Sequence, residues 1–93
     1  MADLGYGEKP FVIVSNNRRN AALDSVLAAR ITTSSKPTMP SIVQLGDGEP
    51  VVGAVLGDDI VEIFHDELAR HRGALSPGAM QHVESALRAA LGL

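Results

Sequence analysis

Several short, largely apolar segments, separated by residues that favour turns, occur in the first two thirds of this chain. They constrain its fold more than any other feature. Residues 11–14 form an uninterrupted, mostly β-branched run that is too short for a helix. Segments with strand character at residues 41–45 and 51–56 flank the turn-forming segment 46–50, and residues 60–63 form one more. We therefore predict short strands at these four places.

The segments between these runs have weaker signals. Residues 1–9 have little pattern and are expected to form a loop, and residues 15–20 are expected to form a polar turn. Residues 23–33 favour a strand, but the alanines at 28 and 29 leave a helix over residues 21–30 as an alternative. Residues 66–71 predict one or two helical turns, ended by Gly73 in a left-handed conformation.

The C-terminal segment has a clear helical pattern. Ser76 is a favourable N-cap, Pro77 suits the first helical position, and Gly92 ends the helix. Apolar residues repeat between these two ends at three-to-four spacing. The 93 residues therefore predict one domain, residues 1–93, that is mainly β, with about five short strands in an antiparallel barrel or half-barrel and a C-terminal helix.

Composition excludes several classes of protein. The chain has no cysteine, which excludes disulfide scaffolds and thiol chemistry, and it has no apolar run of the roughly 18 residues that a membrane-spanning helix needs. A soluble, cytoplasmic domain is expected. The net charge is −3 overall, but +2 over residues 1–36 and −5 over residues 37–93. Any polyanion site is therefore expected in the first half.

Two segments have residue types that suit phosphate chemistry. Lys9 is held by Pro10 at the start of the first predicted strand, and Thr32 begins a run of hydroxyl residues that ends at Lys36. Hydroxyl and ammonium donors bind a phosphate and stabilise added negative charge on it. The histidines are scattered along the chain, and the Asp58-Asp59 pair is a weak metal signal, so no metal site is predicted.

The order of these segments resembles the MazF/PemK family of toxin endoribonucleases of bacterial toxin–antitoxin pairs. The resemblance spans nearly the whole chain. It is carried in order by Asp3-Leu4, Lys9-Pro10, Ser15-Asn16, Asn20, Ile31-Thr32-Thr33-Ser34, Pro40, Gly53-Ala54-Val55-Leu56-Gly57-Asp58, Leu75-Ser76-Pro77 and Leu91-Gly92-Leu93.

The resemblance implies an SH3-like antiparallel barrel of the MazF/CcdB type, forming a homodimer that binds single-stranded RNA and a MazE-like antitoxin. It implies sequence-specific cleavage without metal or cofactor, by attack of the ribose 2′-hydroxyl, leaving 2′,3′-cyclic phosphate and 5′-hydroxyl ends. Lys9, Thr32 and Asp58 occupy the implied catalytic positions. The expected RNA-binding residues are Asn16, Arg18, Arg19, Thr33, Ser34, Ser35 and Lys36.

Three features depart from the family pattern. Lys9 stands where the family usually has arginine, which keeps the charge but loses the bidentate fork. Asp59 stands where glutamine or asparagine is common. The chain also begins near the end of the family's first strand, which predicts either a barrel without that strand or a native start upstream. A catalytically inactive relative that binds an antitoxin and a CcdB-like gyrase inhibitor are the alternative functions.

Overall fold

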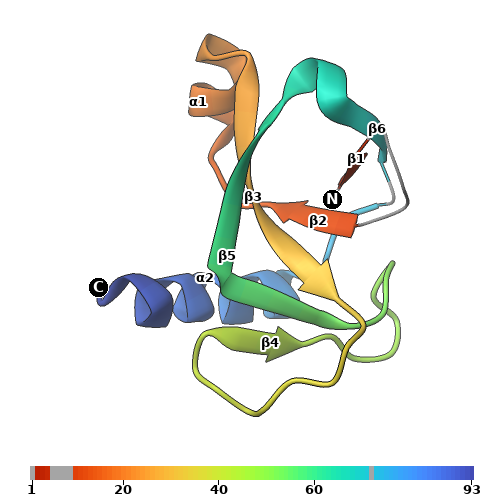
Figure 1. The fold of residues 1–93 in the computed structure, drawn as a ribbon, viewed down its shortest axis with the longest axis vertical. Coiled ribbons are helices and arrows are strands. Elements are labelled where there is room, and N and C mark those ends of the chain that lie inside the picture. The colour runs from red at the N-terminus through yellow and green to blue at the C-terminus, as the bar shows by residue number, and fades with distance from the viewer. Residues whose placement is uncertain (1, 5–9, 72) are drawn as a thin grey trace.

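The computed structural model describes residues 2–4, 10–71 and 73–93 (Figure 1). Its helices and strands, in chain order, are β1 (Ala2–Leu4), β2 (Pro10–Ile13), α1 (Asn17–Ala22), β3 (Ser25–Thr32), β4 (Ile42–Gln44), β5 (Ala54–Phe64), the 3₁₀ helix η1 (His65–Glu67), β6 (Leu68–His71) and α2 (Pro77–Leu91). The strands form one sheet in the order β4-β5-β3-β2-β1-β6. All neighbouring strands in it are antiparallel.

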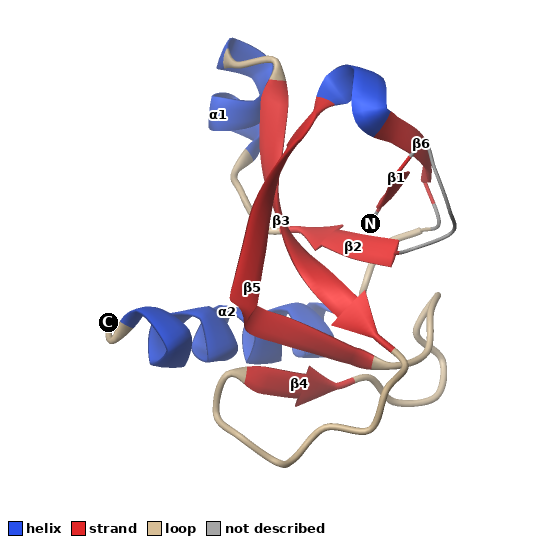
Figure 2. Cartoon of the chain, viewed as in Figure 1, coloured by secondary structure: helices blue, strands red, loops and turns tan. Residues whose placement is uncertain are grey.

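This architecture confirms the mainly antiparallel fold with a C-terminal helix. Among the described strands, β4 and β6 are the two edges of the sheet and do not pair with each other, so the barrel is not closed. Figure 2 shows the strands curling around an open side while α2 lies across the lower part of the sheet.

Strand β5 is the longest element of the sheet, and a bulge divides it. Ile60 pairs with Ala29, but the next pair along β3 joins Arg30 to Leu56. Gly57, Asp58 and Asp59 therefore have no partner on β3, and a bulge of this kind bends its strand. The bend is visible where β5 passes α2 (Figure 1). Because of the bend, residues 60–64 of β5 pair with β3 alone, whereas residues 54–56 pair with both β3 and β4.

Two hydrophobic clusters lie on opposite faces of the sheet, as the alternation of side chains along a strand requires. The larger cluster packs the sheet against α2 and includes Val55 and Val83, both fully buried. The smaller cluster contains Phe11, Val26, Ala28 and Ile63. Burial of the two faces stabilises the sheet on which the candidate site is built.

Several sequence predictions were wrong in detail. Residues 2–4, expected in a loop, form β1, and the helix considered for residues 21–30 is replaced by β3. Pairing with β2 and β5 on its two sides explains this preference, because Ala28 and Ala29 are completely buried between neighbouring strands. Part of the expected turn at residues 15–20 belongs to α1, whose N-terminus is capped by the Asn16 side chain.

The remaining differences lie in β5 and after it. The runs at residues 51–56 and 60–63 were predicted as separate strands, but they contribute to the single strand β5, because both halves find pairing partners. Residues 66–71 were predicted to be helical, but only the short η1 forms, and β6 follows it and pairs with β1. The sheet thus has six strands rather than about five.

The C-terminal helix was predicted correctly. Ser76 caps α2 by accepting a hydrogen bond from the Ala79 N–H, Pro77 is in the first turn, and Gly92 ends the helix in a left-handed conformation. Within the described parts of the chain, no helix is long and apolar enough to cross a membrane.

Candidate functional site

Thr32 is the last residue of β3, and its side chain is held in place by the loop that follows. Its Oγ1 accepts a hydrogen bond of 3.2 Å from the backbone N–H of Ser34. A threonine hydroxyl has one hydrogen to donate and two lone pairs. Accepting this N–H orients the oxygen and leaves the hydroxyl hydrogen for another acceptor. Thr32 is half-buried, whereas Thr33, Ser34, Ser35 and Lys36 are exposed. The structure therefore supports the idea of an oriented donor beside accessible polar groups.

Gly53 packs directly against Thr32 and was not predicted as a site residue. Its φ is +127°, and a Cβ added there would collide with the carbonyl oxygen of Thr32. Only glycine avoids both the unfavourable backbone conformation and this contact. Thr32 pairs with Ala54, the residue after Gly53. The pairing of β3 with β5 therefore brings the Gly53 backbone close to Thr32.

A hollow of about 470 Å³ lies on the outer side of β4 and β5 and includes two predicted site residues, Lys36 and Asp58. Met39, Ile42 and Leu56 provide apolar lining. Ile42 and Leu56 are a cross-strand pair, so their side chains share one face, while the next pair, Val43 and Val55, is buried in the core. Sequence reasoning missed this apolar floor, because Met39 and Ile42 come from a loop and an edge strand without a motif.

The bulge in β5 explains why the acidic residues reach the rim of this hollow. The Gly57 N–H donates a hydrogen bond of 2.8 Å to the Ser41 carbonyl, and a Cβ at Gly57 would lie only 2.7 Å from that oxygen and 3.2 Å from Ala86. Gly57 therefore packs between the β3–β4 loop and α2, with no room for a side chain. Asp58, which follows it, is exposed, and Asp59 forms an ion pair of 3.4 Å with Arg30.

The predicted RNA-binding residues near α1 lie at the other end of β3. The Asn16 side chain caps α1 by accepting the Arg19 N–H. Arg19 donates to the Ser25 carbonyl at 2.9 Å and lies 3.7 Å from Glu62, and Glu62 also accepts the Ser25 hydroxyl. Seven residue steps, about 23 Å in an extended strand, separate Ser25 from Thr32. The structure therefore divides the predicted residues into two groups.

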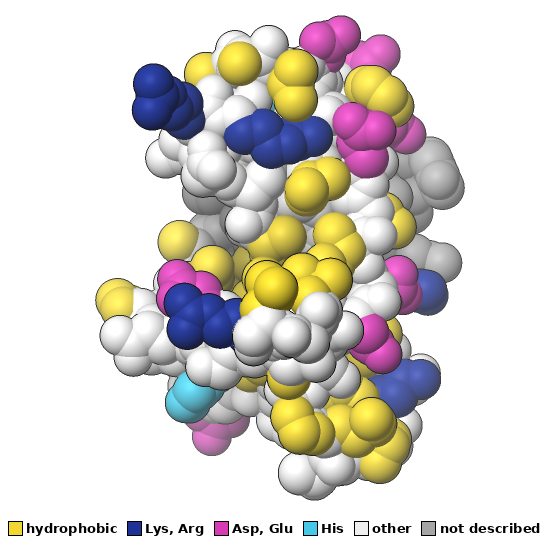
Figure 3. Space-filling model, turned by 90° about the vertical axis from the view of Figure 1, so that its left-hand side faces the viewer, with side chains coloured by type: hydrophobic (Ala, Val, Ile, Leu, Met, Phe, Trp, Pro, Cys, Tyr) yellow, Lys and Arg dark blue, Asp and Glu magenta, His cyan; other side chains and the backbone are white. Residues whose placement is uncertain are grey.

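The charge difference between the two halves of the sequence does not produce two separate surfaces. Arg19 and Arg30 from the basic half pair with Glu62 and Asp59 from the acidic half, because β3 and β5 are neighbours. On the face shown in Figure 3, basic side chains alternate with acidic and hydrophobic ones and form no continuous stripe. Recognition of a polyanion on this face must therefore depend on local groups.

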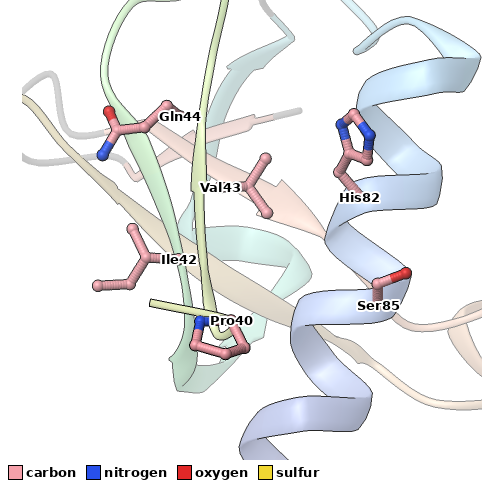
Figure 4. A pocket seen from close by; sticks show the side chains of 6 residues that line it. All are labelled: Pro40, Ile42, Val43, Gln44, His82 and Ser85. Carbon is pink, nitrogen blue, oxygen red and sulfur yellow. The ribbon is translucent and has the colours of Figure 1, made fainter. Parts of the chain in front are cut away.

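A second hollow of about 300 Å³ lies between β4 and α2. Figure 4 shows Val43 pointing from β4 toward the helix, with His82 and Ser85 on α2 beside it. His82 and His65 are exposed. Within the described part of the chain, no three histidine, aspartate or glutamate residues come together as a metal-binding group.

The position of Lys9 lies outside the described residues. The described residue next to it in the chain is Pro10, which begins β2. Because Phe11 pairs with Arg30, the start of β2 and the end of β3 lie at the same end of the sheet. Thr32 is therefore at the end of the sheet where β2 begins.

Comparison with known proteins decides the family. A family model described as PemK-like, MazF-like toxin of type II toxin–antitoxin system matches residues 3–91. The chain belongs to this family.

Its relatives in this toxin family include mycobacterial enzymes. The chain is 44% identical over 91 residues to endoribonuclease MazF1 of Mycobacterium bovis and to endoribonuclease MazF4 of Mycobacterium tuberculosis, covering 98% of this chain and 86% of each relative. A solved endoribonuclease in complex with its cognate antitoxin, from a mycobacterial species, has 43% identity and a TM-score of 0.89, covering 99% of this chain and 88% of that one. The MazF/PemK resemblance inferred from the sequence is confirmed.

Proposed function

We propose that this MazF-like toxin is an endoribonuclease that cuts single-stranded RNA at specific short sequences and is neutralised by a MazE-like antitoxin. The observation that supports this most directly is the oriented Thr32 hydroxyl, in a chain of this toxin family. Its relatives are named endoribonucleases, and one was solved with its cognate antitoxin. The expected place of action is the cytoplasm, where such an RNA substrate is found, and the expected assembly is a homodimer.

The proposed reaction uses the RNA's own nucleophile. The ribose 2′-hydroxyl attacks the neighbouring phosphorus, the bond from phosphorus to the 5′ oxygen breaks, and the products carry a 2′,3′-cyclic phosphate and a 5′-hydroxyl. A base removes the proton of the attacking hydroxyl, and an acid returns a proton to the leaving oxygen. Negative charge grows on the non-bridging phosphate oxygens, and donors aimed at those oxygens lower the barrier.

Thr32 is proposed as one of these donors. Its Oγ1 already accepts the Ser34 N–H, so its own hydrogen remains to be donated to a bound phosphate oxygen. Lys9 is proposed as the cation that balances the phosphate charge, and as the general acid. The support for Lys9 is its place in the sequence, directly before Pro10. Pro10 begins β2 at the end of the sheet where Thr32 lies.

The other predicted residues divide between two tasks. Thr33, Ser34, Ser35 and Lys36 are proposed to contact the sugar and phosphate groups next to the cut, and Arg18, exposed on α1, a more distant phosphate. Asn16 and Arg19 have contacts inside the protein, so RNA binding by these two stays a prediction.

The catalytic role expected for Asp58 also stays a prediction. Asp58 is four residues after Ala54, the partner of Thr32, so at most about 13 Å separates them along β5, which the bulge bends at this point. A separation of that size favours contact with a neighbouring nucleotide over contact with the reacting phosphate.

Cleavage of a long, defined single-stranded RNA in EDTA tests the proposed function. The wild-type protein is expected to make site-specific cuts with cyclic-phosphate ends. Thr32→Ala is expected to lower the cleavage rate about 100- to 1,000-fold, the usual loss when one donor to a developing oxyanion is removed. Thr38→Ala, in the exposed loop after β3, is the matched control and is expected to cut at the wild-type rate.

Two results would contradict the proposal. A folded wild-type protein that cuts no RNA in this assay would leave the inactive, antitoxin-binding relative as the better description. Equal rates for Thr32→Ala and wild type would remove Thr32 from the mechanism. Thr32→Ser retains a hydroxyl and is expected to keep much of the activity.

A further inference from the structure

We propose that the hollow between the β3–β4 loop and β5 is a base-binding subsite that selects a nucleobase bearing an exocyclic amino group and rejects uracil, with Asp58 as the residue that reads the base. The proposal rests on the proposed function and deepens it, because it concerns which nucleotides beside the cut are accepted. It follows from the lining of the hollow, from the state of its charged groups, and from its position relative to Thr32.

The floor of the hollow suits the flat face of a base. Met39, Ile42 and Leu56 line it, and Met39 keeps 47% of its surface exposed although it is a large hydrophobic residue. Flipped-out bases pack against aromatic or apolar side chains, and a methionine thioether makes favourable contacts with aromatic rings. The volume of about 470 Å³ is in the usual range for small-molecule pockets.

The charged groups on the rim differ in availability. Asp59 is engaged by Arg30 at 3.4 Å. Asp58 and Lys36 make no hydrogen bond or ion pair with any part of the chain that the structure describes, and both are exposed. The rim thus presents a free carboxylate and a free ammonium group beside a neutralised pair, so its net charge does not repel RNA.

These two free groups match the two ends of a nucleotide. An ionised carboxylate only accepts hydrogen bonds, so Asp58 needs N–H donors on its partner. Cytosine, adenine and guanine carry an exocyclic amino group, whereas uracil offers only its N3–H, which lies between two carbonyl oxygens that a carboxylate repels. The Lys36 ammonium supplies the complementary contact to a phosphate.

The hollow is also close enough to the proposed cleavage point. Thr32 pairs with Ala54, and Leu56 on the floor follows Ala54 by two residues, about 7 Å along a strand. The loop that starts at Thr32 runs past Lys36 and Met39 and ends at Ile42. A nucleotide next to the scissile phosphate can therefore place its base in the hollow.

The test is the cleavage of a pool of RNAs with a randomised segment, followed by sequencing of the fragments that carry 5′-hydroxyl ends. For the wild-type protein, one position near the cut is expected to be depleted in uracil about 10- to 100-fold relative to its preferred amino-bearing base. Asp58→Asn is expected to abolish most of that depletion at this position, because an amide both donates and accepts, and to leave the other positions unchanged. Asp47→Asn, the same change in the β4–β5 turn, is expected to match wild type.

A binding measurement separates this proposal from the proposed function. Oligonucleotides with a 2′-deoxy sugar at the cut lack the nucleophile, so their dissociation constants report recognition without cleavage. Replacing the preferred base with uracil is expected to weaken binding to the wild-type protein about 10-fold or more, and to Asp58→Asn by less than 3-fold. Met39→Ala is expected to weaken binding of every base about 5- to 10-fold, because the floor is lost.

Three outcomes would overturn the base-binding proposal. The first is an Asp58→Asn protein with wild-type nucleotide preference at every position. The second is an equal fall in cleavage for all sequences, which would make Asp58 a catalytic residue instead. The third is an unchanged preference with weakened antitoxin binding, which would make the hollow an antitoxin contact. Absence of cleavage by the wild-type protein, with a base preference retained in binding, would contradict the proposed function and not this inference.

Discussion

Replacing Gly53 by alanine tests whether the position of Thr32 depends on a close backbone contact. In the structure Gly53 has a φ of +127°, and its missing side chain leaves room for the carbonyl oxygen of Thr32. An alanine there must accept a backbone conformation that L residues rarely adopt, and it must also push Thr32 or its own strand aside.

The size of the effect follows from these two costs. A residue held in such a region of φ/ψ space costs about 1–3 kcal/mol. Forcing extra volume into a packed position costs about another 1–3 kcal/mol. We therefore expect the free energy of unfolding to fall by about 3 kcal/mol, against a total of about 5–14 kcal/mol for a domain of 93 residues. The melting temperature should fall by about 12–24 °C.

Urea denaturation and the RNA cleavage assay measure the two consequences separately. The matched control is Gly46→Ala in the same β4–β5 connection, where a new Cβ has nothing within 4 Å and φ is not positive. It should leave both stability and activity near wild type. For Gly53→Ala, the cleavage rate of the folded fraction should fall about 100-fold, the effect of displacing a reacting group by about 1 Å. Equal stability and equal rates for the two variants would refute the reasoning.

Two further predictions concern the attachment of α2. The Ser76 N–H and hydroxyl donate to the Glu49 carboxylate at 2.9 and 2.7 Å, and these bonds hold the pKa of Glu49 below its ordinary value of 4.5. A carboxyl group whose pKa is lower in the folded state stabilises the protein at pH values above its unfolded-state pKa, and this stabilisation is lost as the pH falls through the folded-state pKa. Glu49→Gln removes this group, so the free energy of unfolding should fall less between about pH 6 and pH 3 than it does in the wild-type protein, as measured by urea titrations. An equal fall in the two proteins would contradict the prediction. Val83 on α2 is completely buried against the sheet, so Val83→Ala should lower the free energy of unfolding by about 2 kcal/mol. Leu91→Ala, at an exposed position of the same helix, should lower it by less than about 1 kcal/mol. A larger loss for Leu91→Ala than for Val83→Ala in urea denaturation would show that α2 packs differently.

Local chemistry made part of the fold readable from the sequence alone. The bounds of α2 follow directly from three residues at its own ends: the N-cap Ser76, Pro77 in the first turn and Gly92 at the C-terminus. The β-branched run at residues 11–14 similarly predicts β2, because its residues favour a half-buried strand whatever pairs with it. The ordered set of segments also identified the toxin family and pointed to Thr32.

Contacts between distant residues decided the rest. Two predicted strands merged into β5, and residues 68–71 became β6, because pairing partners elsewhere in the chain were available. The bulge that includes Asp58 depends on Gly57 fitting between Ser41 and Ala86, which lie far from it in the chain. The sequence alone determined the family, the C-terminal helix and the hydroxyl-rich strand end. Only the tertiary structure decided which of the proposed RNA-binding residues share a surface, because that depends on strand register and packing rather than on local preference.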